Sequence, residues 1–338
     1  MSALRALGEG FRTLGRAWGL AVVLLLVNVA VAALLAVPLA GALEEGLEHR
    51  DSARRMLYGF DFPWWSHWSD SRTGWTTSFG PEILGVGFAF RNLDLLLKGY
   101  LPLGLFAAPR RDDADAGAAA GAAAGPEIDP VILGVGAAYL LLQVFLAGGV
   151  LSVLRGAQGV WTARSLLHGS GFYFGRFVRI ALLALAVDWL IFRLNAPLAR
   201  WVDHQARESV SESGAMAWLL GRHALLLLAL LFVHLVSSYA KVITVLEERS
   251  SALLAMLSSL SFCLRHLLRA AGQYLVVALL GLALLALWHA LDSAWTTTGY
   301  KTQLVTLLLA EALVLGRIAL RLGLLGGQLA LYRRLSAS

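Results

Sequence analysis

The stretch QLVTLLLAEALVLGRIALRLGLLGGQLALYRR, residues Gln303–Arg334, decides the fold. A helix rises 1.5 Å per residue, so its apolar part, 304–331, is long enough to cross a hydrocarbon core of about 30 Å. Glu311, Arg317 and Arg321 would then lie at membrane depth. A charge there costs at least about 2.5–3.5 kcal/mol, so these side chains should face other helices or a water-filled cavity. The stretch therefore predicts a membrane helix that needs partner helices.

The same helix is predicted to carry two stripes along its length, because residues follow one another at 100° around a helix. The polar stripe consists of Gln303, Arg317, Arg321 and Gln328, and the small-residue stripe beside it consists of Gly316, Gly323 and Gly327. Small residues let the backbones of two membrane helices approach closely. The second stripe therefore predicts a close helix–helix contact.

The composition of the whole chain is that of a polytopic, all-α integral membrane protein. Hydrophobic residues make up 58% of the chain and charged residues 15%, with a mean hydropathy of +0.68. Soluble proteins have about 25% charged residues. Six stretches are long and apolar enough to span a bilayer. They are 17–43, 131–154, 180–199, 219–240, 270–291 and 304–331.

The distribution of Lys and Arg predicts the orientation of these six spans. Net positive charge is found in 1–16, 155–179, 241–269 and 332–338, whereas 44–130 holds 8 basic against 13 acidic residues. Because positively charged loops stay on the cytoplasmic side, both termini are predicted to be cytoplasmic. Anionic lipid headgroups are the expected partners of the cytoplasmic arginine clusters. No nucleic-acid-binding module is visible in the sequence.

The abundance of Arg over Lys, which occurs only at Lys98, Lys241 and Lys301, suggests a high-GC bacterial source and therefore a bacterial inner membrane. The N-terminus could alternatively be a cleaved signal peptide, because arginines precede an apolar run that ends in an A-x-A pattern at 40–42. The run from 18 to 37 exceeds the 7–15 residues of a signal peptide's apolar core, so we expect an uncleaved first span.

Three cytoplasmic segments share one design, in which an aromatic residue and then arginines at helical spacing lead directly into a span. They are GEGFRTLGRAWGL (8–20), GFYFGRFVRIALL (171–183) and SFCLRHLLRAAGQYL (261–275). Each is typical of an amphipathic interfacial helix that holds its arginines among lipid headgroups. The N-terminal segment 1–16 is one of them. The design divides the six spans into three hairpins.

The segment 44–130 is the largest extracytoplasmic excursion. Its tryptophans, Trp64, Trp65, Trp68 and Trp75, are predicted to be anchors in the membrane interface, where an apolar ring with a polar N–H is favoured. The alternative is a packed lid over the helix bundle.

The second half of this excursion is predicted to change character twice. Residues 82–105 are expected to form a surface or re-entrant helix, and a seventh crossing is the alternative. Residues 107–128 are low in complexity and poor in large apolar side chains, so a disordered linker is expected there.

Charged and titratable side chains inside the spans form a candidate intramembrane polar site. Its residues are Asp188, Arg193, His234, Glu311, Arg317 and Arg321. An unpaired buried charge is very costly, so Asp188 or Glu311 is expected to pair with Arg317 or Arg321. The excess of bases over acids leaves positive charge that a bound anion or lipid phosphate could neutralise. A structural network of interhelical contacts is the other interpretation.

The search for enzyme motifs is negative. No H-E-x-x-H metal motif, G-x-S-x-G elbow or phosphate-binding loop occurs. Cys263 is the only cysteine, which excludes an internal disulfide and a cysteine-based metal cluster. Asp61, His67 and Asp70 lie beside tryptophans and are expected to be polar interface residues rather than metal ligands. We therefore expect no catalytic residues, metal or cofactor.

Parts of the chain resemble a known group. The segments GGVLSVLRG, GFYFGRFVRIALL, YAKVITVLEERSSALLAMLSSLSFCLRHL and LGRIALRLGLLGGQLALY, between Val131 and Tyr332, resemble uncharacterised six-span bacterial membrane proteins. They are also similar to the membrane domains associated with glycerophosphodiester phosphodiesterases. The resemblance implies six helices with amphipathic cytoplasmic connectors and no activity, since no catalytic domain is present. Many members have an Asp where this chain has Ser238, which puts a charge-based function at that position in doubt.

Two functions from different classes follow from these features. The first is a non-catalytic membrane protein that binds lipid or a protein partner, including a second copy of itself. The alternative is a transporter or channel that uses the polar faces of spans 180–199, 219–240 and 304–331, although none of them shows the mid-membrane break common in transporters.

Overall fold

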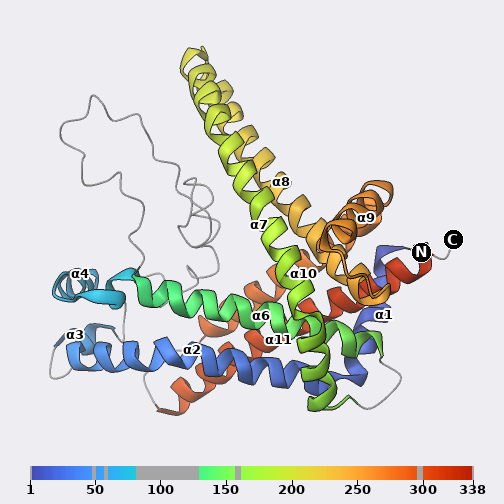
Figure 1. The fold of residues 1–338 in the computed structure, drawn as a ribbon. Helices are drawn as coiled ribbons and strands as arrows, with labels where there is room; N and C mark the ends of the chain where they lie inside the picture. Colours follow the sequence, from blue (N-terminus) through green and yellow to red (C-terminus); the bar gives the residue numbers. More distant parts are fainter. Residues whose placement is uncertain are drawn as a thin grey trace. The chain divides into compact units, whose positions relative to one another are not determined.

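The structure is a computed structural model that describes residues 2–47, 51–56, 60–80, 129–156, 161–294 and 300–336. Every regular element in these residues is helical (Figure 1). The elements are α1 (Ala3–Arg16), α2 (Trp18–Leu47), α3 (Asp51–Met56), α4 (Phe62–Asp70), the 3-10 helix η1 (Gly74–Ser78), α6 (Pro130–Arg155), α7 (Ala163–Glu208), α8 (Glu212–Leu246), α9 (Ala252–Arg265), α10 (Leu267–Asp292) and α11 (Tyr300–Ser336). The predictions for 82–105 and 107–128 lie outside the described residues.

Five of the described helices are long and apolar enough to cross a membrane, namely α2, α6, α8, α10 and α11. They contain five of the six predicted spans and indicate a multi-pass membrane protein, because only a helix satisfies its own backbone hydrogen bonds in lipid. The remaining predicted span, 180–199, is not among the five. It forms the middle of α7, which continues without interruption for 46 residues.

The chain divides into two compact units, which are described separately. Unit 1 consists of residues 1–72, 139–179 and 238–338. Unit 2 consists of residues 73–138 and 180–237. The helices α6, α7 and α8 contribute residues to both.

Three segments of unit 1 begin and end alike: α1, the first part of α7, and α9. Their N-terminal side chains, Ser2, Thr162 and Ser251, each accept a hydrogen bond from the backbone N–H three residues later, at 3.4, 3.2 and 3.4 Å. Such N-caps satisfy a backbone donor that a helix start leaves unpaired. An alanine follows each cap, and the fourteenth residue is always an arginine, at Arg16, Arg176 and Arg265.

The residue after that arginine differs in conformation among the three segments. The chain leaves the helix at Ala17 (φ −117°, ψ 30°) and at His266 (φ −125°, ψ 30°), and a membrane helix begins at the next residue. In α7 the helix instead continues through Phe177, whose side chain is fully buried. The predicted connector and span are therefore two helices in the first and third hairpins and one helix in the second.

Each of the three segments packs against the second membrane helix of the preceding hairpin. The Gly10 backbone of α1 meets Gly326 and Gly327 of α11, and Ser170 of α7 meets Gly149 of α6. The Phe262 ring of α9 lies 5.2 Å from a ring of α8, that of Tyr239. The connector before each hairpin thus contacts a helix of another hairpin. The first connector contacts the third hairpin, the second contacts the first, and the third contacts the second.

The packing of α1 shows that it is more than a membrane-surface anchor. Its apolar face, at Ala6, Leu7, Gly10 and Leu14, is buried. The glycine stripe predicted on α11 is where it packs: Gly323 contacts the ring of Phe11 and Gly327 contacts Leu7. The close contact predicted along that stripe is present: α1 is the partner at Gly323 and Gly327, and Gly316 meets Leu284 of α10.

Candidate functional site

The six predicted intramembrane residues are divided between the two units. Glu311, Arg317 and Arg321 lie on α11 in unit 1. The other three lie in unit 2, with Asp188 and Arg193 on α7 and His234 on α8. The two groups of residues are therefore described separately.

In unit 1, Arg321 is joined to two other membrane helices by a chain of hydrogen bonds. Its Nη1 donates to Gln143 Oε1 of α6 at 3.1 Å. Gln143 Nε2 donates to Asn28 Oδ1 of α2 at 3.5 Å, and Tyr139 Oη donates to the same oxygen at 2.5 Å. Asn28 Nδ2 donates to the carbonyl of Leu24 at 2.6 Å. The guanidinium is thus held by a glutamine whose own orientation is fixed from a third helix.

Sequence analysis missed Asn28, Tyr139 and Gln143, although comparing the three hairpins would have revealed two of them. Gln143, His234 and Arg321 each stand five residues before a pair of buried residues in their helix, which begins at Gly148, Tyr239 and Gly326 respectively. Asn28 and Asp188 each stand twelve residues after the arginine that ends the connector. The hairpins therefore carry polar residues at equivalent positions.

The other two charges of α11 are not neutralised by each other. Arg317 is exposed, and no ion pair joins Glu311 to either arginine among the described residues of unit 1. One carboxylate oxygen of Glu311, Oε2, is buried without a hydrogen-bond partner there. The described contacts of Glu311 therefore lend no support to its pairing with Arg317 or Arg321. The pairing through Asp188 stays a prediction, because Asp188 belongs to unit 2.

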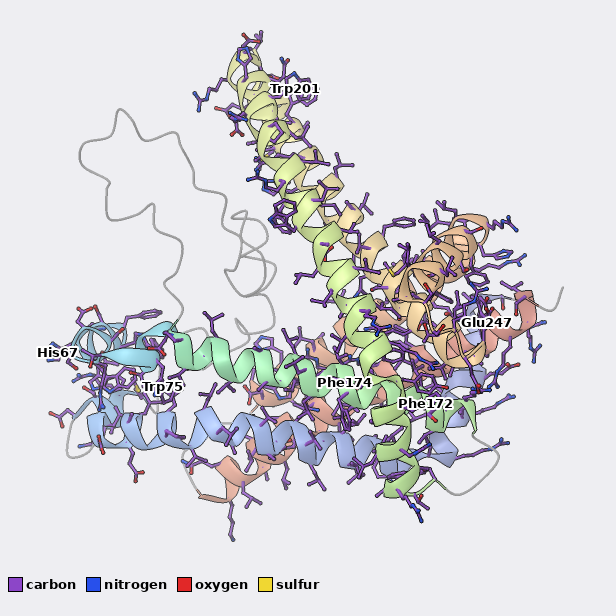
Figure 2. The ribbon with its side chains drawn as sticks, in the orientation of Figure 1. His67, Trp75, Phe172, Phe174, Trp201 and Glu247 are labelled. Atoms are coloured by element: carbon purple, nitrogen blue, oxygen red, sulfur yellow. The ribbon has the colours of Figure 1, made fainter. Side chains whose placement is uncertain are left out.

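In unit 2, charged side chains gather toward the end of α7 that is joined to α8. The Arg193 guanidinium lies 5.4 Å from the Trp189 ring, a cation–π contact. Arg222 and Asp203 form a long ion pair of 3.9 Å between α7 and α8. Near the tip, the rings of Trp201 and Trp218 meet edge to face at 5.3 Å (Figure 2). The contact of Arg193 lies within α7, and the other two join α7 to α8.

A second polar cluster of unit 1 lies where α8, α10 and α11 meet, and its Tyr239, Gln273 and Gln328 side chains are fully buried. Tyr239 Oη donates to Gln273 Oε1 at 3.1 Å, and Gln273 Nε2 donates to the Gly327 carbonyl at 3.1 Å. Gln328 makes the reciprocal contacts: Ser238 Oγ donates to its Oε1 at 2.9 Å, and its Nε2 donates to Tyr274 Oη at 2.9 Å. Both buried glutamine amides donate and accept a hydrogen bond. The cluster therefore stabilises the packing of these three helices through interhelical hydrogen bonds.

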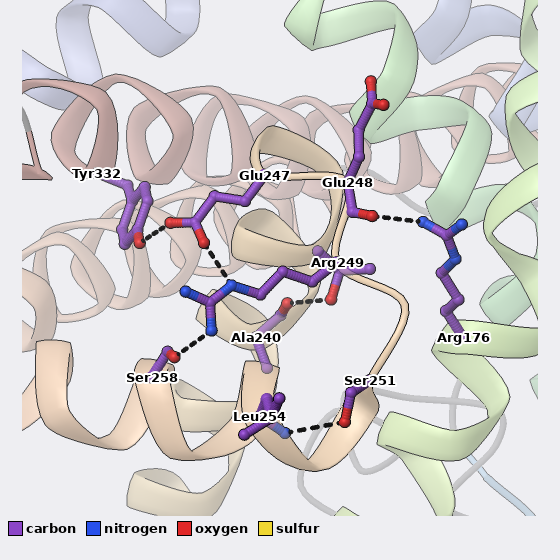
Figure 3. A network of polar contacts seen from close by, with 10 residues as sticks. Arg176, Ala240, Glu247, Glu248, Arg249, Ser251, Leu254, Ser258 and Tyr332 are labelled. Carbon is purple, nitrogen blue, oxygen red and sulfur yellow. Dashed lines mark hydrogen bonds and ion pairs between the residues drawn. The ribbon is translucent and has the colours of Figure 1, made fainter.

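A third network joins the turn between α8 and α9 to α9, to α7 and to the C-terminal part of α11 (Figure 3). The Glu247 carboxylate accepts from Tyr332 Oη of α11 and from Arg249 Nε, each at 2.5 Å. Arg249 Nη1 also donates to Ser258 Oγ of α9 at 2.6 Å. A single glutamate thus fixes the five-residue turn between α8 and α9 against α11.

Glu248, the next residue, has φ +55°, a left-handed conformation that is uncommon for a residue with a Cβ. Two arginines hold it there. Arg155 of α6 donates to the Val245 carbonyl at 2.7 Å and to Glu248 Oε1 at 2.9 Å, and Arg176 of α7 donates to the Glu248 carbonyl at 3.2 Å. The arginines satisfy carbonyls at the C-terminus of α8, where cations are favoured.

The predicted tryptophan anchors are mostly packed inside the protein. Trp64, Trp65 and Trp68 of α4 are only 5–6% exposed. Trp64 Nε1 and Trp68 Nε1 donate to the Gly46 and Ala42 carbonyls of α2, both at 3.3 Å. These contacts favour the alternative of a packed lid on the end of α2.

Trp75 belongs to unit 2, whereas α4 belongs to unit 1. Its ring meets the ring of Phe79 at 5.9 Å (Figure 2). A position of the four tryptophans in the membrane interface stays a prediction.

Acid should loosen this lid through Asp61, the N-cap of α4. Asp61 accepts from Arg55 Nε at 2.7 Å and from Trp64 N at 3.2 Å, and the contact with Arg55 lowers its pKa below the ordinary 3.8. Ionised Asp61 therefore stabilises the lid above about pH 4, and this is lost as pH falls through the lower folded-state pKa. Asp61→Asn keeps a capping oxygen and removes the charge. Between pH 6 and 3 the tryptophan emission of the wild type should change more than that of the variant, and identical titrations would contradict this.

The sole cysteine should be unreactive in the folded protein. Cys263 is buried in α9, and burial raises the pKa of its thiol to about 11. At pH 8 only about one thiol in a thousand would then be the reactive thiolate. We expect a water-soluble maleimide to leave the native chain unlabelled over an hour at pH 8 and to label it stoichiometrically in SDS. Rapid labelling of the native chain would show that α9 detaches from the bundle.

No group of three or more His, Cys, Asp and Glu side chains suited to a metal ion occurs in the part of the chain that the structure describes. Comparison with protein families, with curated proteins and with solved structures finds no match to this chain. The resemblance to phosphodiesterase-associated membrane domains therefore stays a prediction, and the function has to be inferred from the chain's own residues.

Proposed function

We propose that this chain is a non-catalytic, six-span protein of a bacterial inner membrane, with both termini in the cytoplasm, that binds anionic phospholipid at its cytoplasmic face. The span that is not among the five long apolar helices is the third in chain order, and it is the middle of α7, at 180–199. Its lipid-binding surface is formed by α9 and the first turn of α10, and a protein partner is the competing occupant that the experiment below tests.

The observation that carries this proposal is the reversed amphipathicity of α9. Its buried face consists mostly of small residues: Ala252, Ala255, Ser259 and Cys263, together with Phe262. Its outward face carries Leu253, Leu254, Leu257 and Leu264, which are 53–60% exposed. Small side chains let α9 approach the bundle closely, and the large apolar ones are left outside. Such a face is stable only against another apolar phase.

The position of α9 in the chain supports lipid as that phase. It follows the end of α8 at Leu246 after five residues, and α10 begins at Leu267 after His266 alone. Both neighbours are long enough to cross the membrane, so both ends of α9 are held at the same bilayer surface. The Phe262 ring lies 4.9 Å from that of Tyr332 near the end of α11. An in-plane helix at this level presents its outward leucines to acyl chains.

The charge around α9 supports an anionic headgroup. Between Glu248 and Asp292 the chain contains no acidic residue. Arg265 and Arg269, at the junction with α10, are exposed and are free to reach phosphates. Near a membrane surface each such cation adds about 1 kcal/mol of attraction to anionic lipid.

The test is native mass spectrometry of the full chain released from discs that contain equal amounts of phosphatidylglycerol and phosphatidylethanolamine. We expect the wild type to retain phosphatidylglycerol preferentially and Arg265→Gln with Arg269→Gln to lose that preference. Arg200→Gln with Arg207→Gln is the matched control, because it removes two exposed arginines from the other end of α7. Equal retention in all three proteins, or a retained protein in place of lipid, would refute the proposal.

A further inference from the structure

We propose that Arg317 and Arg321 of α11 form a binding site for a phosphate oxyanion inside the membrane, with Gln143, Asn28 and Tyr139 as positioning residues. The ligand is the phosphate group of a phospholipid or inorganic phosphate, which present the same oxygens. The site shares no residue with the α9 surface. Its existence is therefore independent of the lipid binding proposed above.

The depth of the site follows from helix geometry. Gln143 lies twelve residues before Arg155, and Arg321 lies twelve residues before Arg333. At 1.5 Å per residue both are about 18 Å along the helix from those cytoplasmic arginines. Asn28 lies ten residues into α2, about 15 Å from its start. Three helices thus place polar side chains at a similar level, well inside a hydrocarbon core of about 30 Å.

The guanidinium of Arg321 is oriented before any ligand arrives. Gln143 accepts from one of its N–H groups, and Asn28 fixes the Gln143 amide by accepting from its Nε2. Tyr139 donates to Asn28 and so decides which way the asparagine amide points. Of the five guanidinium N–H donors, four remain for another acceptor. This arrangement resembles the supporting shell of a binding site, since the supporting groups are neutral and leave the positive charge in place.

The charge of the region calls for an anion. Arg317 lies one helical turn from Arg321 on the same face, and both side chains are exposed. Glu311 makes no ion pair with these cations among the described residues of unit 1. Two cations at membrane depth without a paired carboxylate in their own unit are costly unless an anion neutralises them.

The type of anion follows from the donors. A guanidinium presents two parallel N–H groups that match two oxygens of one phosphate, and a second arginine one turn away can reach the remaining oxygens. In a membrane, phosphate is also the oxyanion present at highest concentration, as the headgroup diester. We therefore assign phosphate as the chemical class and leave its source to the experiment.

The experiment follows the thermal stability of the full chain, delipidated in dodecyl maltoside, through its intrinsic tryptophan fluorescence. Inorganic phosphate is titrated against chloride at equal ionic strength, and phosphatidylglycerol is titrated against diacylglycerol with the same acyl chains. Stabilisation by inorganic phosphate would identify the free anion as a ligand. Stabilisation by phosphatidylglycerol alone, with diacylglycerol inactive, would identify the headgroup. Either result supports the site.

Variants test whether the stabilisation by phosphate or phosphatidylglycerol depends on the proposed residues. Arg321→Gln should weaken the apparent affinity roughly 10- to 100-fold, since it removes a charged, two-pronged contact. Arg321→Lys should recover only part, because it restores the charge without the fork. Tyr139→Phe should weaken binding less, and it keeps the proposal testable should Arg321 variants misfold. Arg265→Gln with Arg269→Gln removes the contribution of the α9 surface to the phosphatidylglycerol response. In that background the remaining response should still be weakened by Arg321→Gln.

Three results would overturn the proposal. The first is stabilisation by neither phosphate nor phosphatidylglycerol. The second is an equal response of wild type and Arg321→Gln. The third is loss of stability in Arg321→Gln that Asp188→Asn restores, since the guanidinium would then be neutralised by a carboxylate of the chain itself.

Discussion

Replacing Gly10 by alanine is expected to destabilise the protein by about 3 kcal/mol, at the upper end of the range for overpacking. A Cβ at this position would overlap the Gly323 carbonyl oxygen and the Gly327 nitrogen of α11. Because these are backbone atoms, no side-chain rotation can relieve the overlap, and α1 would have to move away from α11. Thermal unfolding in detergent, followed by tryptophan emission, measures the loss.

Gly8 of the same helix provides the matched control. A Cβ there has no heavy atom within 4 Å. Gly8→Ala should therefore stabilise the protein slightly, by about 0.5–1 kcal/mol, because alanine is the better helix former. If the two variants had the same stability, α1 would not pack on α11 as described. Because that contact also closes the cycle of three hairpins, Gly10→Ala should in addition expose the third hairpin to proteolysis.

Replacing Gln273 by leucine is expected to cost about 2–4 kcal/mol in the same measurement. The amide is fully buried, and its loss leaves the Tyr239 hydroxyl and the Gly327 carbonyl without their described partner. A buried polar group left unpaired costs about 1–3 kcal/mol. The leucine is of similar size, so the change removes hydrogen bonds without opening a large cavity.

The double variant Tyr239→Phe with Gln273→Leu separates the hydrogen bond from the packing. Removing both partners leaves no unpaired hydroxyl, so the double variant should be less destabilised than the sum of the single variants. The difference should be about 0.6–1.7 kcal/mol, the range measured for hydrogen bonds between membrane helices. Strict additivity would mean that the two side chains do not interact.

The polar residues show where prediction from sequence reached its limit. Arg321 was identified because a charge in an apolar stretch is conspicuous on its own. Asn28 and Gln143 were missed because a single neutral amide in a membrane helix is unremarkable until its partner is known. Their positions in the repeat would have singled them out. The contact between them and Arg321 still depends on α2, α6 and α11 being neighbours, and that is a property of the tertiary structure.

The tryptophans show a second limit of prediction from sequence: the residues were identified, but their environment was not. Their ring chemistry favours a membrane interface, and the sequence therefore predicted anchors there. The contacts of Trp64 and Trp68 with carbonyls of α2 satisfy the same indole N–H groups inside the protein. Composition cannot distinguish the two environments, because both offer an apolar surface beside a hydrogen-bond acceptor.

The sequence by itself determined that the chain is helical and crosses a membrane, because in lipid a long apolar segment must satisfy its own backbone hydrogen bonds. It also located the close-packing stripe of α11, since helical periodicity alone brings Gly316, Gly323 and Gly327 together. Only the tertiary structure decided that α1 packs on Gly323 and Gly327 of that stripe, that α7 continues from connector to span as one helix, and that Gln143 holds Arg321. Each of these depends on which helices become neighbours, and the periodicity of one helix carries no information about its neighbour.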